Sequence, residues 1–288
     1  MSDFRSSSPL SPVDLTGNEM RLGAAEDIPR AGVAGLQLPG LDQLTEFRPD
    51  TDLLKSNHIV GFRSNSAVSR PFNLLRTQIT EACEQNGFST LGVVSAVPHE
   101  GKSFLAANLA AALSRLPQLE VYLLDLDLRR PSLAGLFGIE DSVGLETFLE
   151  TGEPNLATIG RRLAGTNLGL FATAAATSNV AGALHGERFE ALMTGIRANT
   201  GTSRIVVCDL PPVFVGDDAM AVAKHLDSYI HVVGSGTSTT RQFEELRRLL
   251  KDTHCLGSVL NRYIGGPFDP YGYGQYSKAY DGYFSDPD

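Results

Sequence analysis

Hydrophobic and polar positions alternate with two different spacings along this chain. Between residues 71 and 87, apolar side chains recur every three or four positions, and Gly87 follows the last of them. This spacing predicts an amphipathic helix that ends at the glycine.

From residue 90 onwards, short and almost unbroken apolar runs alternate with helical patterns. The predicted strands are 90–95, 121–126, 205–210, 229–233 and 256–260. The predicted helices among them lie near 103–115, 188–197, 217–225 and 240–251. Unbroken apolar strands separated by helices are typical of a parallel sheet with helices on both faces. We therefore predict an α/β fold with a mostly parallel sheet, whose chemistry lies at the C-terminal ends of the strands.

Both ends of the chain differ from this middle part. Residues 1–50 contain five Ser, five Pro and five Gly but only two aromatic residues, whereas six of the eight tyrosines lie after residue 262. Neither end has enough periodic apolar sequence to offset the entropy of ordering. We predict a flexible leader over 1–55, a folded domain over 56–262 and a mobile, tyrosine-rich tail over 263–288.

One uncharged stretch, 163–186, is long enough to be mistaken for a membrane span. It contains four glycines and several threonines and asparagines, so it lacks the nearly continuous apolar sequence that a span requires. We interpret it as buried and loop segments of the folded domain.

The composition narrows the function classes. The 288 residues include 24 basic and 33 acidic ones, a net charge of −9, which argues against binding to nucleic acid. The three cysteines are far apart and no histidine pair has metal-ligand spacing, so we expect neither a disulfide framework nor a zinc site. The first residues lack the apolar core of a signal peptide. These features predict a cytoplasmic protein.

A phosphate-binding loop is the strongest motif. Residues 96–103 read AVPHEGKS, a Walker A pattern between a predicted strand and a predicted helix. The loop amides surround an anion, the lysine reaches the terminal phosphates and the hydroxyl binds Mg²⁺. A chance Gly-Lys-Ser turn is the alternative, but it would not explain the strand before and the helix after. We predict ATP and Mg²⁺ as cofactors. The residues expected to bind them here are Pro98, His99, Glu100, Gly101, Lys102, Ser103 and Phe104.

Two further predicted strands end in aspartates. Asp125 and Asp127 are two residues apart, so both carboxylates can lie on one side of the strand end, where one would bind Mg²⁺ and the other accept a proton. Asp209 ends a buried run, as a Walker B strand requires for its metal ligand. The alternatives are a solvated Asp–Arg pair at the first strand end and a helix cap at Asp209. Asp217 and Asp218 in the next loop fit a helix N-terminus at least as well as a catalytic role.

These motifs together resemble one known family. The segments PHEGKS, LLDLDLRRPSL, VVCDLPPV and LGSVLNR, followed by the tyrosine-rich end, resemble the cytoplasmic ATPase component of the bacterial tyrosine kinases (BY-kinases) of capsular and exopolysaccharide synthesis. The resemblance covers residues 56–288 and implies a P-loop fold with Walker A, A′ and B motifs.

The resemblance also implies roles for individual residues. Lys102 would contact the β and γ phosphates, and Ser103 would bind Mg²⁺. Asp125 would be the catalytic base for a tyrosine hydroxyl, with Asp127 and Asp209 supporting the metal. Further residues are implied near the adenine and as autophosphorylation sites. These are Asn261 and Arg262 for the adenine, and Tyr271, Tyr273, Tyr276, Tyr280 and Tyr283 for phosphorylation.

The sequence departs from the family pattern at three places. His99 stands where the family usually has glycine, so it must adopt the backbone angles of the loop. The helical oligomerisation motif Glu-x-x-Arg-x-x-Arg is replaced by Arg70, Asn73 and Arg76, which leaves a homo-oligomer open. The membrane-spanning activator region of some members is absent, so we expect a separate membrane polysaccharide co-polymerase or chain-length regulator as a partner. This partner would recruit the protein to the inner face of the membrane. A tyrosine phosphatase is the second expected partner.

Three functions are compatible with these residues. The first is an ATP-dependent protein-tyrosine autokinase that phosphorylates its own tail in trans and controls polysaccharide polymerisation or export. The second is a nucleotide-switch ATPase of the partition and division-site type, but those proteins have an early loop lysine where this chain has Val97. The third is an ATP-binding scaffold that regulates a membrane polymerase without tyrosine phosphorylation. The tyrosine-rich tail also argues against the second function, and the alternative interpretation of that tail is an adhesive Gly/Tyr segment with no chemistry.

Overall fold

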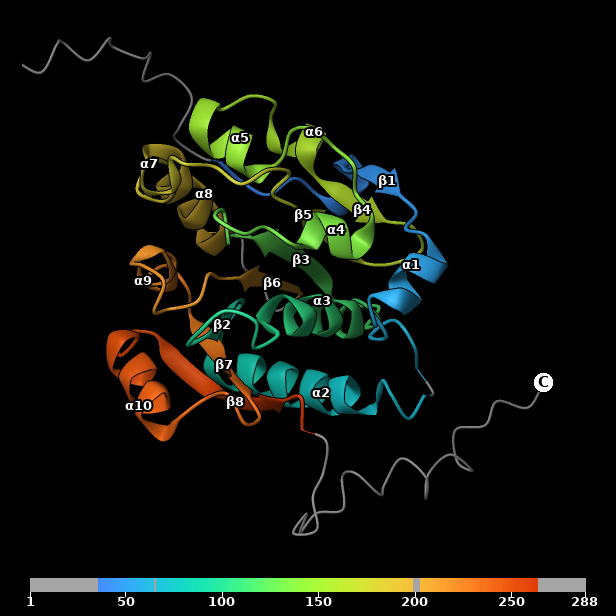
Figure 1. The fold of residues 1–288 in the computed structure, drawn as a ribbon. Helices are drawn as coiled ribbons and strands as arrows, with labels where there is room; N and C mark the ends of the chain where they lie inside the picture. Colours follow the sequence, from blue (N-terminus) through green and yellow to red (C-terminus); the bar gives the residue numbers. More distant parts are fainter. Residues whose placement is uncertain (1–35, 65, 199–202, 264–288) are drawn as a thin grey trace, which may run out of the picture. The chain divides into compact units, whose positions relative to one another are not determined.

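Eight strands form one sheet in the part of the chain that the computed structural model describes, residues 36–64, 66–198 and 203–263 (Figure 1). The strands are β1 (Thr45–Phe47), β2 (Thr90–Ser95), β3 (Glu120–Asp125), β4 (Arg161–Leu163), β5 (Leu168–Phe171), β6 (Arg204–Asp209), β7 (Ser228–Gly234) and β8 (His254–Asn261). Their order is β1-β4-β5-β3-β6-β2-β7-β8, and within the described chain only the β4–β5 pair is antiparallel. The mostly parallel α/β fold is confirmed.

The helices follow from local sequence signals. The described residues belong to one compact unit. Its helices are α1 (Thr51–Ser56), α2 (Arg70–Asn86), α3 (Lys102–Leu113), α4 (Leu133–Phe137), α5 (Leu145–Thr151), α6 (Leu156–Ile159), α7 (Val180–Leu184), α8 (Glu187–Ala198), α9 (Asp218–Ala223) and α10 (Thr240–Leu249). Helix α2 has Pro71 in its first turn and ends at Gly87, whose φ of 68° closes the last turn.

Two hydrophobic cores cover the two faces of the sheet. Successive strand residues point to opposite faces, so Val93, Leu123 and Val207 join α2, α3 and α4 in one core. Their neighbours Leu124 and Cys208 join α5, α7, α8, α9 and α10 in the other. Both faces are therefore covered, as a parallel sheet requires.

Residues 36–55 differ from the predicted leader. Leu38, Leu41 and Leu44 are buried, and the Tyr122 hydroxyl donates a hydrogen bond of 2.9 Å to the Pro39 carbonyl. Three leucines at spacing three are enough to bind a short segment to the core, although the surrounding Gly and Pro suggested a loose chain. The predicted boundary at residue 55 is therefore too late.

The uncharged stretch 163–186 contains a central strand. All four residues of β5 are buried between β3 and β4, while loops and the short helix α7 occupy much of the rest. No helix in the described ranges is both long enough and apolar enough to cross a membrane. The five tyrosines expected to be phosphorylated, 271 to 283, lie outside the described residues.

Candidate nucleotide site

The candidate site lies where the C-terminal ends of three neighbouring strands meet. β2 lies beside β6, and β6 lies beside β3, with Asp125 and Asp209 paired in register. The phosphate loop leaves β2 at the same edge and leads into α3. Parallel pairing therefore brings the Walker A loop and both aspartate motifs together, as the sequence predicts.

Two left-handed residues shape the phosphate loop. Gly101 has φ of 94° and His99 has φ of 66°. A Cβ at Gly101 would lie 2.1 Å from Nδ2 of Asn261, so glycine is required there both for the backbone angle and for the close approach of β8. Histidine tolerates left-handed angles better than most residues, and His99 adopts the conformation for which the family usually uses glycine.

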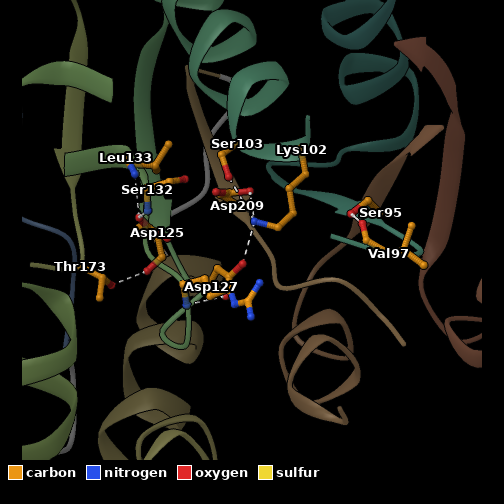
Figure 2. A network of polar contacts seen from close by, with 11 residues as sticks. Ser95, Val97, Lys102, Ser103, Asp125, Asp127, Ser132, Leu133, Thr173 and Asp209 are labelled. Atoms are coloured by element: carbon orange, nitrogen blue, oxygen red, sulfur yellow. Dashed lines mark hydrogen bonds and ion pairs between the residues drawn. The ribbon is translucent and has the colours of Figure 1, made fainter. Parts of the chain in front are cut away.

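Lys102 lies among the carboxylates at the start of α3 (Figure 2). Its Nζ is 2.7 Å from Oδ2 of Asp127, 3.6 Å from Oδ1 of Asp209 and 3.1 Å from Oγ of Ser103. Burial alone would lower the pKa of Lys102, but the charges of Asp209 and Asp127 outweigh it and the pKa is raised. Lys102 is therefore a firmly protonated ammonium.

Asp125 is fully buried and held by backbone amides. Its Oδ2 accepts hydrogen bonds from the N–H groups of Ser132 (3.1 Å) and Leu133 (3.0 Å), while its Oδ1 has no hydrogen-bond partner in the described chain (Figure 2). Thr173 Oγ1 fixes the strand end by donating to the Asp125 carbonyl at 2.8 Å. Burial, reinforced by the charge of Asp209, raises the pKa of Asp125 to about 8. The carboxyl can therefore exchange a proton near neutral pH.

Asp209 is the least satisfied polar group of the site. The side chain is completely buried, and neither carboxylate oxygen has a hydrogen-bond partner among the described residues. Burial raises the pKa of Asp209, and the Lys102 ammonium opposes this effect. A buried carboxylate whose oxygens accept no hydrogen bond is costly unless a cation or donor beyond Lys102 compensates it.

The charges fit a divalent cation. One ammonium, Lys102, faces the three carboxylates of Asp125, Asp127 and Asp209, so the fully ionised group carries a net charge of −2. Oxygen ligands are those Mg²⁺ prefers, and Mg²⁺ is commonly held by one or two carboxylates together with nucleotide phosphates and water. Within the described ranges, no group of three or more His, Cys, Asp or Glu could hold a metal ion.

Two side chains expected at the nucleotide point elsewhere. Glu100 is 1% exposed and turns inward, where Oε2 accepts from the N–H groups of Ala96 and Val97. The partly buried Phe104 ring packs edge-on against Phe72 of α2 with centroids 5.8 Å apart, since α2 and α3 share one core. These two positions stay predicted nucleotide contacts through their backbone amides, in the phosphate loop and the first turn of α3, and not through their side chains.

The residues implied near the adenine lie at the end of β8. Asn261 Nδ2 donates a hydrogen bond of 2.8 Å to the Glu100 carbonyl, so this side chain holds the backbone of the phosphate loop. Arg262 is exposed and has φ of 60°. Pro98 remains at the partly exposed rim of the loop.

One ion pair of the site was not predicted. Arg129 binds Asp218 through two hydrogen bonds, one of them 3.1 Å from Nη2 to Oδ1, and so joins the loop after β3 to the first turn of α9. The adjacent arginine and acidic doublets gave no signal of the pairing. A separate cavity of about 560 Å³, beside Arg115 and Asn167, lies at the opposite end of α3 and is not part of this site.

Comparison with known proteins supports the resemblance noted in the sequence. No family model matches the chain. The tyrosine-protein kinase YwqD of Bacillus subtilis is 26% identical over 222 residues, covering 76% of this chain and 92% of YwqD. The tyrosine-protein kinase wzc of Salmonella typhimurium is 28% identical over 228 residues, covering 75% of this chain but 31% of wzc. The chain thus spans nearly all of one relative and about a third of the other.

Solved structures share the fold. The chimerical protein CapA2B2 aligns with a TM-score of 0.62 at 24% identity, covering 78% of this chain and 95% of that one. The kinase domain of the Escherichia coli tyrosine kinase ETK aligns with a TM-score of 0.60 at 22% identity, covering 68% and 76%. The cell division ATPase MinD of Pyrococcus furiosus aligns at 0.52 and 23%, covering 66% and 79%. The P-loop fold is confirmed, and the chain is a homologue of the bacterial tyrosine-protein kinases.

Proposed function

We propose that this protein is an ATP-dependent protein-tyrosine autokinase whose acceptor residues are the tyrosines of its own C-terminal segment, modified in trans. The observation that carries the proposal is the placement of the Lys102 ammonium and three buried carboxylates beside the phosphate loop. The acceptors proposed are Tyr271, Tyr273, Tyr276, Tyr280 and Tyr283.

Each group of the site has a distinct task in this reaction. Lys102, whose pKa is raised, neutralises negative charge on the phosphoryl group during its transfer to the acceptor tyrosine. Asp125, held in one orientation by the amides of Ser132 and Leu133, accepts the proton of the tyrosine hydroxyl. Its pKa of about 8 makes it a better proton acceptor than an ordinary carboxylate once it is ionised.

Magnesium and ATP fit the remaining groups. Ser103, Asp127 and Asp209 would hold Mg²⁺, since they supply a hydroxyl and carboxylate oxygens, and those of Asp209 accept no hydrogen bond in the described structure. When bound, Mg²⁺ neutralises charge on the phosphates. The loop amides from His99 to Ser103 would hold the phosphates at the N-terminus of α3.

The cellular role proposed is control of exopolysaccharide or capsule polymerisation or export. It rests on the motif resemblance to kinases of those systems. A membrane polysaccharide co-polymerase would recruit the protein to the inner face of the membrane and activate it, and a tyrosine phosphatase would reverse the modification. Each phosphate adds about −1.5 to −2 charges, so several of them would make the acidic C-terminal segment strongly repulsive.

Mass spectrometry of the C-terminal peptide tests the proposal. Phosphatase-treated wild type and Lys102→Met are incubated separately with ATP and Mg²⁺, with and without the cytoplasmic segment of a candidate membrane activator. Phosphate on the tyrosines of wild type alone is expected. ATP hydrolysis with an unmodified peptide under both conditions would refute the autokinase and favour a switch ATPase. ATP binding without hydrolysis or modification would favour the scaffold.

A further inference from the structure

Glu100 occupies an unusual place, since it is a carboxylate inside a loop that binds phosphate. Its side chain is 1% exposed and is turned into the protein, where it binds backbone donors of the loop and of β7. A negative charge beside phosphates would oppose nucleotide binding. The presence of a carboxylate at this position therefore indicates that it has another task.

The Glu100 carboxylate binds donors from two distant segments. Oε2 accepts from the N–H groups of Ala96 (3.0 Å) and Val97 (3.2 Å), at the beginning of the phosphate loop. Oε1 accepts from the N–H of Gly234 (3.3 Å), at the end of β7, and from the hydroxyl of Ser238. Four donors thus satisfy both oxygens, which explains how the side chain is buried.

The loop needs such support because its backbone is not relaxed. Glu100 lies between His99 and Gly101, both in left-handed conformation, and a left-handed histidine persists only where surrounding contacts hold it. The Glu100 carbonyl is held as well, by Asn261 Nδ2 at 2.8 Å. Side chain and backbone of this one residue therefore join the loop to the ends of β7 and β8.

The same contacts lead to α10. Ser238 precedes the N-cap of α10, Thr239, and its hydroxyl accepts from the Gly234 N–H at 2.9 Å while it donates to Glu100. Further along, Phe243 of α10 stacks on His231 of β7, with ring centroids 5.2 Å apart. A shift of the α10 N-terminus would therefore move the Ser238 hydroxyl away from the Glu100 carboxylate.

We infer that Glu100 is a positioning residue that sets the shape of the phosphate loop and couples it, through Ser238, to the N-terminus of α10. The inference rests on the proposed function, since it concerns the affinity of that site for nucleotide. It predicts that a change at Ser238, which lies outside the phosphate loop, alters nucleotide binding.

The experiment compares Ser238→Ala, Glu100→Ala and the double variant with wild type. Affinity for Mg·ADP is measured by calorimetry, and hydrogen–deuterium exchange of the peptide containing residues 96–104 is measured without nucleotide. Thr237→Ala is the matched control, because Thr237 is exposed and lies in the same connection, whereas the hydroxyl that binds Glu100 in the described structure is that of Ser238. Melting temperature is recorded for every protein.

Ser238→Ala should weaken Mg·ADP binding about threefold to tenfold and speed exchange in the loop peptide, with little change in melting temperature. Glu100→Ala should weaken binding at least as much, and the double variant should equal Glu100→Ala because the serine acts through the carboxylate. Thr237→Ala should match wild type. Glu100→Asp, which keeps the charge but is too short to reach both segments, should resemble Glu100→Ala.

Wild-type exchange and affinity in Ser238→Ala would overturn the inference, as would additive losses in the double variant. If wild type itself fails to bind Mg·ADP, the proposed function fails, and the exchange measurement still decides whether Glu100 and Ser238 hold the loop. If Glu100→Ala does not fold, Ser238→Ala carries the test alone.

Discussion

Replacing Asp125 by Asn should stabilise the nucleotide-free protein while abolishing tyrosine phosphorylation. Folding raises the pKa of Asp125 from 3.8 to about 8, chiefly through burial and then through the charge of Asp209. A raised carboxyl pKa means that its contribution to stability is complete below about pH 4 and is lost as the pH rises towards 8. The wild type therefore carries a cost at neutral pH that an uncharged side chain does not.

The magnitude follows from the interval between the two pKa values. At pH 7 an isolated group shifted in this way costs about 4 kcal/mol, and at pH 5 less than half of that. Asparagine can still accept the amide hydrogen bonds of Ser132 and Leu133, but its NH₂ group gains no assured acceptor. Asp209 also shares the titration. We expect a net gain of about 1–3 kcal/mol at pH 7, which raises the melting temperature by about 2–10 °C.

Denaturant unfolding at pH 5, 6, 7 and 8, without nucleotide and at constant ionic strength, measures the effect. The gap between Asp125→Asn and wild type should widen with each step in pH. Asp52→Asn is the control, because the pKa of this exposed carboxyl is lowered by its hydrogen bond to Lys55 and its removal should leave the wild-type slope. Parallel curves for Asp125→Asn and wild type would refute the reasoning, as would undiminished tyrosine phosphorylation for the proposed base.

Two further predictions concern packing and thiol chemistry. Gly101→Ala places a Cβ 2.1 Å from Nδ2 of Asn261 at a φ of 94°. This variant should lose more than about 1 kcal/mol of unfolding free energy and most of its nucleotide affinity. Gly135→Ala is the control, because a Cβ there enters open space on α4, and both quantities should stay unchanged or improve slightly. With iodoacetamide at pH 8, the half-buried Cys255 should react before Cys208, because burial raises the pKa of the Cys208 thiol to about 12. Mass spectrometry that shows Cys208 modified in the folded protein would contradict this.

Local patterns were sufficient to predict the elements that carry the site. The strands ending near Ser95, Asp125 and Asp209 and the helix beginning at Lys102 all lie within two residues of their predicted ends. They were predictable because a buried parallel strand is apolar on both faces and because its end is marked by a change to Gly, Pro or Asp. The meeting of Lys102 with Asp127 and Asp209 follows from that topology.

Other features depend on tertiary contacts that no local pattern records. β1 and β4 have only three residues each, too few to show a pattern. β5 reads LGLF within a stretch without periodicity, so its pairing with β3, and not its local sequence, makes it a strand. The sequence places Glu100 in the phosphate loop but does not show that its carboxylate faces Gly234 and Ser238, more than 130 residues away. The Arg129–Asp218 pair is hidden for the same reason.

His99 has a consequence for inhibitor selectivity. Its backbone takes the left-handed angles of the phosphate loop, while its imidazole is exposed at the rim. A kinase with glycine at this position offers no side chain there to an inhibitor that occupies the nucleotide site. A compound that extends an acidic or aromatic substituent from the phosphate subsite to the imidazole would gain a contact in this protein. The same compound would gain no such contact in a kinase with glycine at this position. Chemical labelling of the same ring would report occupancy of the site directly.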